Sequence, residues 1–138
     1  MVGVPRSKPG HAPGYTGHTF LRLLKQAGFK GSIHPVNPKA DVIDGVKAYP
    51  GVTAIPEAVG LAIVAVPVLS VTQVHERDVK AGIANLRIAT ASFSETGEAK
   101  GREMEEKARD TALKGGLRVV GPNCLGYHVP SARMQMCG

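Results

Sequence analysis

The sequence has no tryptophan, only three tyrosines and three phenylalanines, and only two cysteines. So few aromatic side chains leave little surface on which nucleic-acid bases could stack. The two cysteines, Cys124 and Cys137, form neither a disulfide framework nor a metal-binding pattern. The five histidines are scattered, and no pair has the spacing of metal ligands on a helix. We therefore predict no metal site and a core built mainly from Val, Ile, Leu and Ala.

Long apolar segments are also missing. The longest run, residues 61–69, is about as long as a strand and contains Pro67, whereas a membrane helix needs about 20 apolar residues. The N-terminus lacks the apolar core of a signal peptide. We therefore expect a cytoplasmic protein that does not enter a membrane, with an organellar location as the alternative if a presequence has been lost.

The charge is positive, with a formal net value of +6. A positive protein favours an anionic ligand, although many soluble domains are basic without a specific reason. Lysine and arginine are spread along the chain without a basic run, which argues against nucleic acid as a partner. A phosphate-rich small molecule accounts for the charge equally well.

Strand patterns and helix patterns alternate along the chain. Residues 61–66 are continuously apolar, as in a strand buried on both faces of a parallel sheet, whereas Phe20, Leu24 and Ala27 recur at helical spacing. The length of 138 residues corresponds to one domain, residues 1–138. We predict an α/β fold, a Rossmann-like doubly wound parallel sheet of about five strands with helices on both faces. The predicted strands are residues 1–4, 32–36, 61–66, 86–91 and 117–120, the predicted helices are residues 18–27, 69–81 and 98–113, and residues 46–49 form a short extended piece.

In such sheets, ligands bind outside the carboxyl ends of the strands, so the loops that follow the strands form the candidate site. The first loop, residues 5–17, carries Gly10, Gly14 and Gly17 and opens a helix. Glycines let the backbone approach a phosphate closely, and free N–H groups at a helix start favour an anion. The loop matches neither the strict dinucleotide fingerprint nor a P-loop, so an ordinary flexible loop is the alternative.

The second strand ends in Asn37-Pro38-Lys39 and has no acidic residue after it. An NAD site would have Asp or Glu at this point to bind the ribose hydroxyls. Lys39 suits a ribose phosphate instead, which both coenzyme A and NADP carry. The alternative interpretation of Lys39 is a solvated surface lysine.

Three later loops complete the predicted site. Pro67 follows Val66 at a strand end, where its fixed backbone can form a wall against an adenine or a pantetheine arm. Small and hydroxyl residues at positions 89–91 leave room and donors for a ligand. The turn Gly-Pro-Asn-Cys-Leu-Gly at residues 121–126 supplies an asparagine. We interpret Cys124 in this turn as a small buried residue, because no nearby group activates it as a nucleophile.

Taken in order, these motifs resemble the N-terminal CoA-binding domain of NDP-forming acyl-CoA synthetases, which is related to the α-subunit of succinyl-CoA synthetase. The resemblance covers nearly the whole chain, and Gly-Pro-Asn-Cys-Leu-Gly is its most specific part. Two departures bear on affinity: Pro5 stands where the family usually has serine, and Ser92 stands where it often has glycine. The matching segments are residues 2–4, 9–10, 27–31, 35–39, 45–50, 63–67, 93–97 and 120–126.

The resemblance implies coenzyme A as the cofactor and a role for each loop. The first loop would hold the CoA phosphates, Lys39 would contact CoA, and the later loops would line the path of the adenine and pantetheine groups up to Asn123. The implied CoA-binding residues are Gly3, Pro5, Arg6, Gly10, Gly14, Tyr15, Thr16, Gly17, Lys39, Val66, Pro67, Ala89, Thr90, Ala91 and Asn123.

The resemblance also implies that this chain has no catalytic residues. The whole enzymes act through a phosphohistidine on a second domain, which an ATP-grasp part phosphorylates, and no histidine here lies in that motif. Only 12 residues follow Gly126. We expect a fragment of an acid–thiol ligase that binds CoA, catalyses nothing alone and has an ATP-grasp subunit or domain as its partner. The first strand is so short that we expect part of it to be missing.

The alternative function is that of an NAD(P)-binding Rossmann domain from an oxidoreductase or a redox sensor. The missing acidic residue after the second strand argues against NAD, but Lys39 does not exclude NADP. The sequence leaves open the acyl substrate and whether the chain forms a homo-oligomer.

Overall fold

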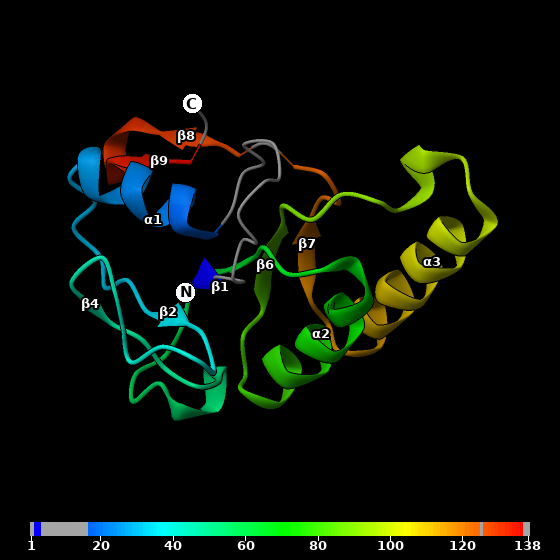
Figure 1. Ribbon diagram of the computed structural model, residues 1–138, viewed down its shortest axis with the longest axis horizontal. Helices are drawn as coiled ribbons and strands as arrows, with labels where there is room; N and C mark the ends of the chain where they lie inside the picture. The colour runs from blue at the N-terminus through cyan, green and yellow to red at the C-terminus, as the bar shows by residue number, and fades with distance from the viewer. Residues whose placement is uncertain (1, 4–16, 125, 137–138) are drawn as a thin grey trace.

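The computed structural model describes residues 2–3, 17–124 and 126–136. Its centre is a parallel sheet with the strand order β2-β1-β5-β6-β7 (Figure 1). Two short antiparallel hairpins lie outside this sheet: β3 (Val42–Ile43) with β4 (Val46–Lys47), and β8 (His128–Val129) with β9 (Met134–Gln135). The sheet strands are β1 (Val2–Gly3), β2 (Pro35–Val36), β5 (Ala62–Val64), β6 (Asn85–Ile88) and β7 (Arg118–Val120), and the helices are α1 (Gly17–Gln26), α2 (Val71–Lys80) and α3 (Ala99–Lys114).

The order of the strands in the sheet changes direction at β1: β2 is added on one side of β1, and β5, β6 and β7 follow on the other side. Val2 lies opposite Pro35 of β2 on one side and Ile63 of β5 on the other. Beyond β2, Tyr49 forms a parallel bridge with Val36. With Tyr49 counted as a third strand, the order becomes 3-2-1-4-5-6, which is the order of Rossmann folds. The boundary between β1 and β5 is therefore the switch point of the sheet, beside which such folds bind their ligands.

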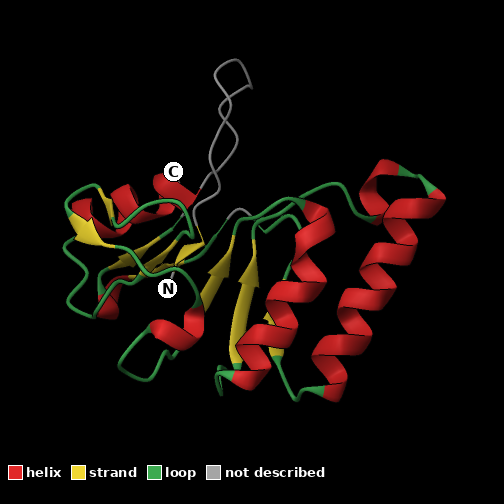
Figure 2. Ribbon diagram, turned by 60° about the horizontal axis from the view of Figure 1, so that its bottom comes forward, coloured by secondary structure: helices red, strands yellow, loops and turns green. Residues whose placement is uncertain are grey.

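Helices cover both faces of the sheet because side chains alternate along each strand. On β5, Ala62 and Val64 belong to the core that α2 and α3 close, and these two helices lie side by side (Figure 2). Ile63 belongs to the opposite core with Phe20 and Leu24 of α1. The side chains of Val64, Ile63, Phe20 and Leu24 are fully or almost fully buried. Burial of each stabilises the fold by roughly 1.5–3 kcal/mol. The predicted Rossmann-like fold is confirmed.

One predicted helix begins later than expected. Its first residues form a 3-10 turn, Val68–Ser70, before α2 starts at Val71. Three more turns of this kind interrupt the loops, at Val52–Ala54, Ser94–Thr96 and Pro130–Ala132. Within the described ranges, no helix is both long enough and apolar enough to span a bilayer.

Two hairpins were not predicted. The first joins β3 (Val42–Ile43) to β4 (Val46–Lys47) through Asp44 and Gly45, which have φ angles of 48° and 74°. Two successive positive φ angles in Asp-Gly are typical of a tight two-residue hairpin turn. The second joins β8 (His128–Val129) to β9 (Met134–Gln135), and the adjoining Met136 is fully buried against the α1 core.

An arginine lies fully buried in the middle of β6. The guanidinium carbon of Arg87 lies 4.1 Å from the centre of the Phe20 ring, and Nη2 donates a hydrogen bond to the Cys124 carbonyl. Nε and Nη1 have no hydrogen-bond partner. Arg87 thus links the sheet, helix α1 and the turn after β7, although its charge is incompletely compensated.

Candidate functional site

A cavity of about 350 Å³ opens at the carboxyl ends of β2 and β5. Three predicted binding residues, Lys39, Val66 and Pro67, line it together. Lys39 lies 27 positions before Val66 in the sequence, so the fold has brought two separate segments to one place. The other lining residues are Val36, Asn37, Pro38, Pro50, Gly51, Val52, Ile63, Val64, Ser70, Gln73, Val74, Arg77 and Asp78.

The backbone around Lys39 is fixed by its neighbours. The Asn37 side chain is buried, and its Oδ1 accepts a 2.9 Å hydrogen bond from the Lys39 backbone N–H. The Asn37 N–H in turn donates to the Tyr49 carbonyl at 2.9 Å. Lys39 is itself exposed. Its ammonium group is therefore free to meet a ligand, while its backbone is held at the rim of the cavity.

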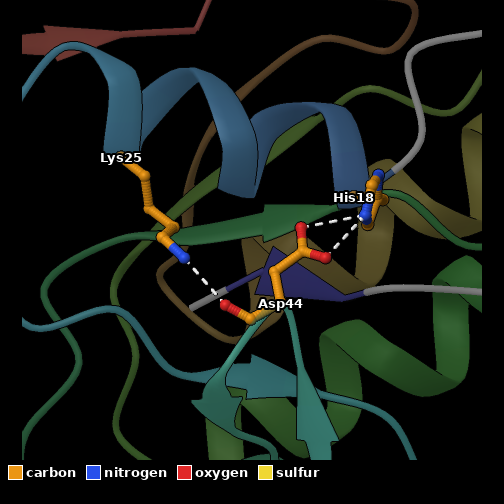
Figure 3. Close-up of polar contacts among 3 residues, drawn as sticks. All are labelled: His18, Lys25 and Asp44. Atoms are coloured by element: carbon orange, nitrogen blue, oxygen red, sulfur yellow. Dashed lines mark hydrogen bonds and ion pairs between the residues drawn. The ribbon is translucent and has the colours of Figure 1, made fainter.

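The far end of the same segment is attached to helix α1 (Figure 3). His18 Nε2 lies 2.8 Å from Asp44 Oδ2 and 3.0 Å from Oδ1, and Lys25 Nζ donates to the Asp44 carbonyl at 2.7 Å. Asp44 occupies the turn of the β3–β4 hairpin. The chain between residues 37 and 44, which carries Lys39, is thus held at both ends.

Thr90 connects two more predicted residues. Its hydroxyl donates to the Val66 carbonyl at 2.7 Å, and its own carbonyl accepts a 2.9 Å hydrogen bond from the Asn123 N–H. The ends of β5, β6 and β7 are therefore joined into one continuous rim. Ala89 is half-buried beneath this rim and Ala91 is exposed on it.

The turn after β7 fits closely over β6. Gly121 has a φ of 119°, and a Cβ atom there would overlap the Ile88 carbonyl oxygen. The Gly121–Pro122 peptide bond is cis, and Asn123 has a φ of 50°. Asn123 is exposed, whereas Cys124 is half-buried rather than fully buried as expected. The tight turn therefore exposes Asn123 more than Cys124.

Ser92 occupies a backbone conformation that favours glycine. Its φ is 77°, in the left-handed region. Glu95 stabilises this loop, because its two carboxylate oxygens accept hydrogen bonds from the N–H groups of Ser92 and Phe93 at 2.6 and 2.9 Å. The departure from glycine noted in the sequence therefore coincides with a conformation that costs a serine energy.

Only the two ends of the first loop belong to the described residues. Pro5, Arg6, Gly10, Gly14, Tyr15 and Thr16 lie outside the described residues. Gly3 ends β1 beside Val36 of β2, and Gly17 begins α1 as a buried residue. The two ends of the loop therefore flank the switch point.

Helix α2 supplies lining residues that the sequence interpretation missed. Asp78 is fully buried, and neither carboxylate oxygen has a hydrogen-bond partner. Burial raises the pKa of Asp78 to about 7. The signal was present, because Asp78 follows Val71 and Val74 at helical spacing and so occupies the inward stripe of α2.

Two further observations concern a second cavity and the possibility of a metal site. A larger cavity of about 560 Å³ lies between α2, α3 and β7, but none of the predicted binding residues lines it. Its buried histidine, His75, uses Nδ1 to bond the Ala108 carbonyl at 3.3 Å. In the part of the chain that the structure covers, no three His, Cys, Asp or Glu side chains gather as a metal site would require.

Comparison with known proteins identifies the family to which the chain belongs. Residues 9–130 match the family described as CoA binding domain. Acetate–CoA ligase (ADP-forming) II of Archaeoglobus fulgidus is 43% identical over 113 residues, which are 82% of this chain and 17% of the relative. The α-subunit of acetate–CoA ligase (ADP-forming) I of Pyrococcus furiosus is 34% identical over 126 residues, which are 88% of this chain and 27% of the relative.

A solved structure also relates the chain to these enzymes. The dinucleotide-forming acetyl-coenzyme A synthetase 1 of Candidatus Korarchaeum cryptofilum, in complex with phosphate and ADP, superposes with a TM-score of 0.86 and 34% identity. The superposition covers 99% of this chain and 28% of the synthetase chain. Nothing in these comparisons supports the oxidoreductase alternative. The chain belongs to the CoA-binding domain family and is related to the NDP-forming acyl-CoA synthetases.

Proposed function

We propose that this chain binds coenzyme A in the cavity between β2, β5 and α2, with the ribose 3′-phosphate at Lys39. The observation that carries the proposal is the convergence of Lys39, Val66 and Pro67 on one cavity. A lysine at the rim attracts a phosphate, and the apolar wall formed by Val66 and Pro67 suits the flat face of a base. The net charge of +6 favours the encounter with this polyanionic cofactor.

The remaining predicted residues extend this site along the edge of the sheet. The diphosphate of CoA would lie at the start of α1, beside Gly17, because the N-terminus of a helix favours an anion. The pantetheine arm would then follow the rim of Thr90 and Asn123 that joins the strand ends. The roles of Pro5, Arg6, Gly10, Gly14, Tyr15 and Thr16 in holding the phosphates remain predictions.

The chain would hold CoA for a reaction completed elsewhere. It spans 17% to 28% of the length of the three relatives compared above, which are ligases or synthetases of acetate and CoA. We propose that it provides the CoA-binding part of such an acid–thiol ligase and that an ATP-grasp subunit or domain acts with it. That subunit or domain would supply the groups that form the thioester.

Calorimetric titration of the full chain with CoA, NADP and ATP tests the cofactor. CoA should bind, and NADP and ATP should bind at least about tenfold more weakly, because neither carries both a 3′-phosphate and a pantetheine arm. Binding of NADP without binding of CoA would contradict the proposal and restore the oxidoreductase alternative.

A further inference from the structure

The deep end of the CoA cavity holds a carboxyl group that no described contact explains. Asp78 lies on the inner side of α2, about 10 Å along the helix axis from Val71 at its start. Its side chain lines the cavity and is fully buried, and both carboxylate oxygens lack a hydrogen-bond partner. An unpaired carboxyl group in an apolar setting costs folding free energy, so a ligand that paired with it would recover that cost.

Burial favours the neutral form of this acid more strongly than the positive charge of the N-terminus opposes it. The other charged side chains that line the cavity, Lys39 and Arg77, are both exposed, and Val64 and Val74 supply apolar surface. A neutral carboxylic acid offers one O–H donor beside one carbonyl acceptor. The Watson–Crick edge of adenine offers the complementary pair, the N1 acceptor beside the N6 amino donor.

The size of the cavity fits one end of the cofactor. A volume of about 350 Å³ is at the small end of ligand pockets, which span about 300–1,000 Å³, so it suits the adenosine part of CoA rather than the whole molecule. A base inserted from the Lys39 rim would point its amino edge toward α2. Because no hydrogen bond holds the Asp78 carboxyl in place, rotation about its Cα–Cβ bond can turn it toward that edge.

We propose that Asp78 is a specificity-determining residue that recognises the N1 and N6 positions of the adenine ring of CoA at the floor of this cavity. The proposal rests on the proposed function, because it assumes that CoA enters between β2, β5 and α2. Beyond CoA binding itself, the proposal assigns to Asp78 the discrimination between adenine and a base whose Watson–Crick edge is blocked.

The test compares CoA with 1,N6-etheno-CoA, in which both recognised positions are blocked but the phosphates and pantetheine are intact. Calorimetry of the wild type at pH 6 should show about tenfold tighter binding of CoA, as expected for two hydrogen bonds. The Asp78→Ala variant should bind the two ligands within about threefold of each other. The Asp78→Asn variant should keep the preference, because its amide also offers one donor beside one acceptor.

The pH profile separates recognition from a merely structural role. In the wild type, the preference for CoA over etheno-CoA should fall above about pH 7, because an ionised carboxylate cannot donate to N1. In Asp78→Asn it should stay constant with pH, and in Asp78→Ala it should be absent at every pH. Equal preference for CoA in the wild type and in Asp78→Ala would overturn the role of Asp78 while leaving CoA binding established. Failure of the wild type to bind either ligand would overturn the proposed function together with this inference.

Discussion

Replacing Asp78 by asparagine should make the protein more stable at pH 8 and leave its stability at pH 4 nearly unchanged. Burial raises the pKa of Asp78 from its ordinary value of 3.8 to about 7 in the folded protein. Between pH 3.8 and pH 7, Asp78 therefore keeps its proton in the folded state but has lost it in the unfolded state. The stabilising contribution of Asp78 is greatest below pH 3.8 and is lost as the pH rises toward 7.

The size of this effect follows from the two pKa values. Each pKa unit corresponds to about 1.4 kcal/mol, so the full loss above pH 7 is at most about 4 kcal/mol. Asparagine keeps the shape of the side chain but cannot ionise, so the variant should escape this loss. The difference in unfolding free energy between Asp78→Asn and the wild type should grow from near zero at pH 4 to several kcal/mol at pH 8.

Urea unfolding of both proteins at pH 4, 6 and 8 measures this difference. Burial lowers the pKa of His75, which gives the wild type and the variant the same opposing slope on the acid side, so subtraction removes it. Asp110→Asn, at an exposed carboxylate on α3, is the control and should change stability by less than about 0.5 kcal/mol at each pH. A difference between Asp78→Asn and the wild type that does not grow with pH would refute the reasoning.

Five further substitutions, one of them a control, test the backbone and the core by urea unfolding. Ser92→Gly should raise stability by about 0.5–1 kcal/mol, because relief of the left-handed conformation exceeds the entropy cost of glycine, and a loss would contradict the assigned φ of 77°. Gly121→Ala should lower stability by about 2 kcal/mol or more, whereas Gly51→Ala, in open space, should stay within about 0.5 kcal/mol, and equal effects would count against the close fit of the turn. Arg87→Ala should cost about 3 kcal/mol, and Arg87→Met should cost less than half as much because it keeps the stem over Phe20. Because both variants remove the charge, equal costs would show that the charge and not the packing matters.

Much of the fold could be predicted because its main elements follow simple periodic patterns. The continuously apolar segment at residues 61–66 became β5, and the helical spacing of Phe20 and Leu24 became the buried side of α1. The hairpins could not be found in the same way, because two-residue strands are too short to show a period. The Asp44-Gly45 pair was a usable turn signal that was overlooked.

The rim of the candidate site was also within reach of sequence reasoning, whereas its floor was not. Lys39 and Pro67 follow strands, and the carboxyl ends of parallel strands meet at one edge of the sheet. Asp78 comes from the middle of a helix, so its place in the cavity depends on how α2 packs against β5. An acid in the inward stripe of that helix could have been noticed, but its lack of a partner appears only in three dimensions.

The most direct test of the account is a cycle that combines one substitution with one change of the ligand. Titration of the wild type with CoA and with dephospho-CoA, which lacks only the 3′-phosphate, should show about tenfold tighter binding of CoA, as expected for a hydrogen bond to a charged group at an exposed site.

In Lys39→Ala that difference should nearly disappear, whereas it should persist in Lys80→Ala, which removes an exposed lysine from the far end of α2. Equal loss of affinity for both ligands in Lys39→Ala, with the difference between them preserved, would contradict the placement of the 3′-phosphate at Lys39.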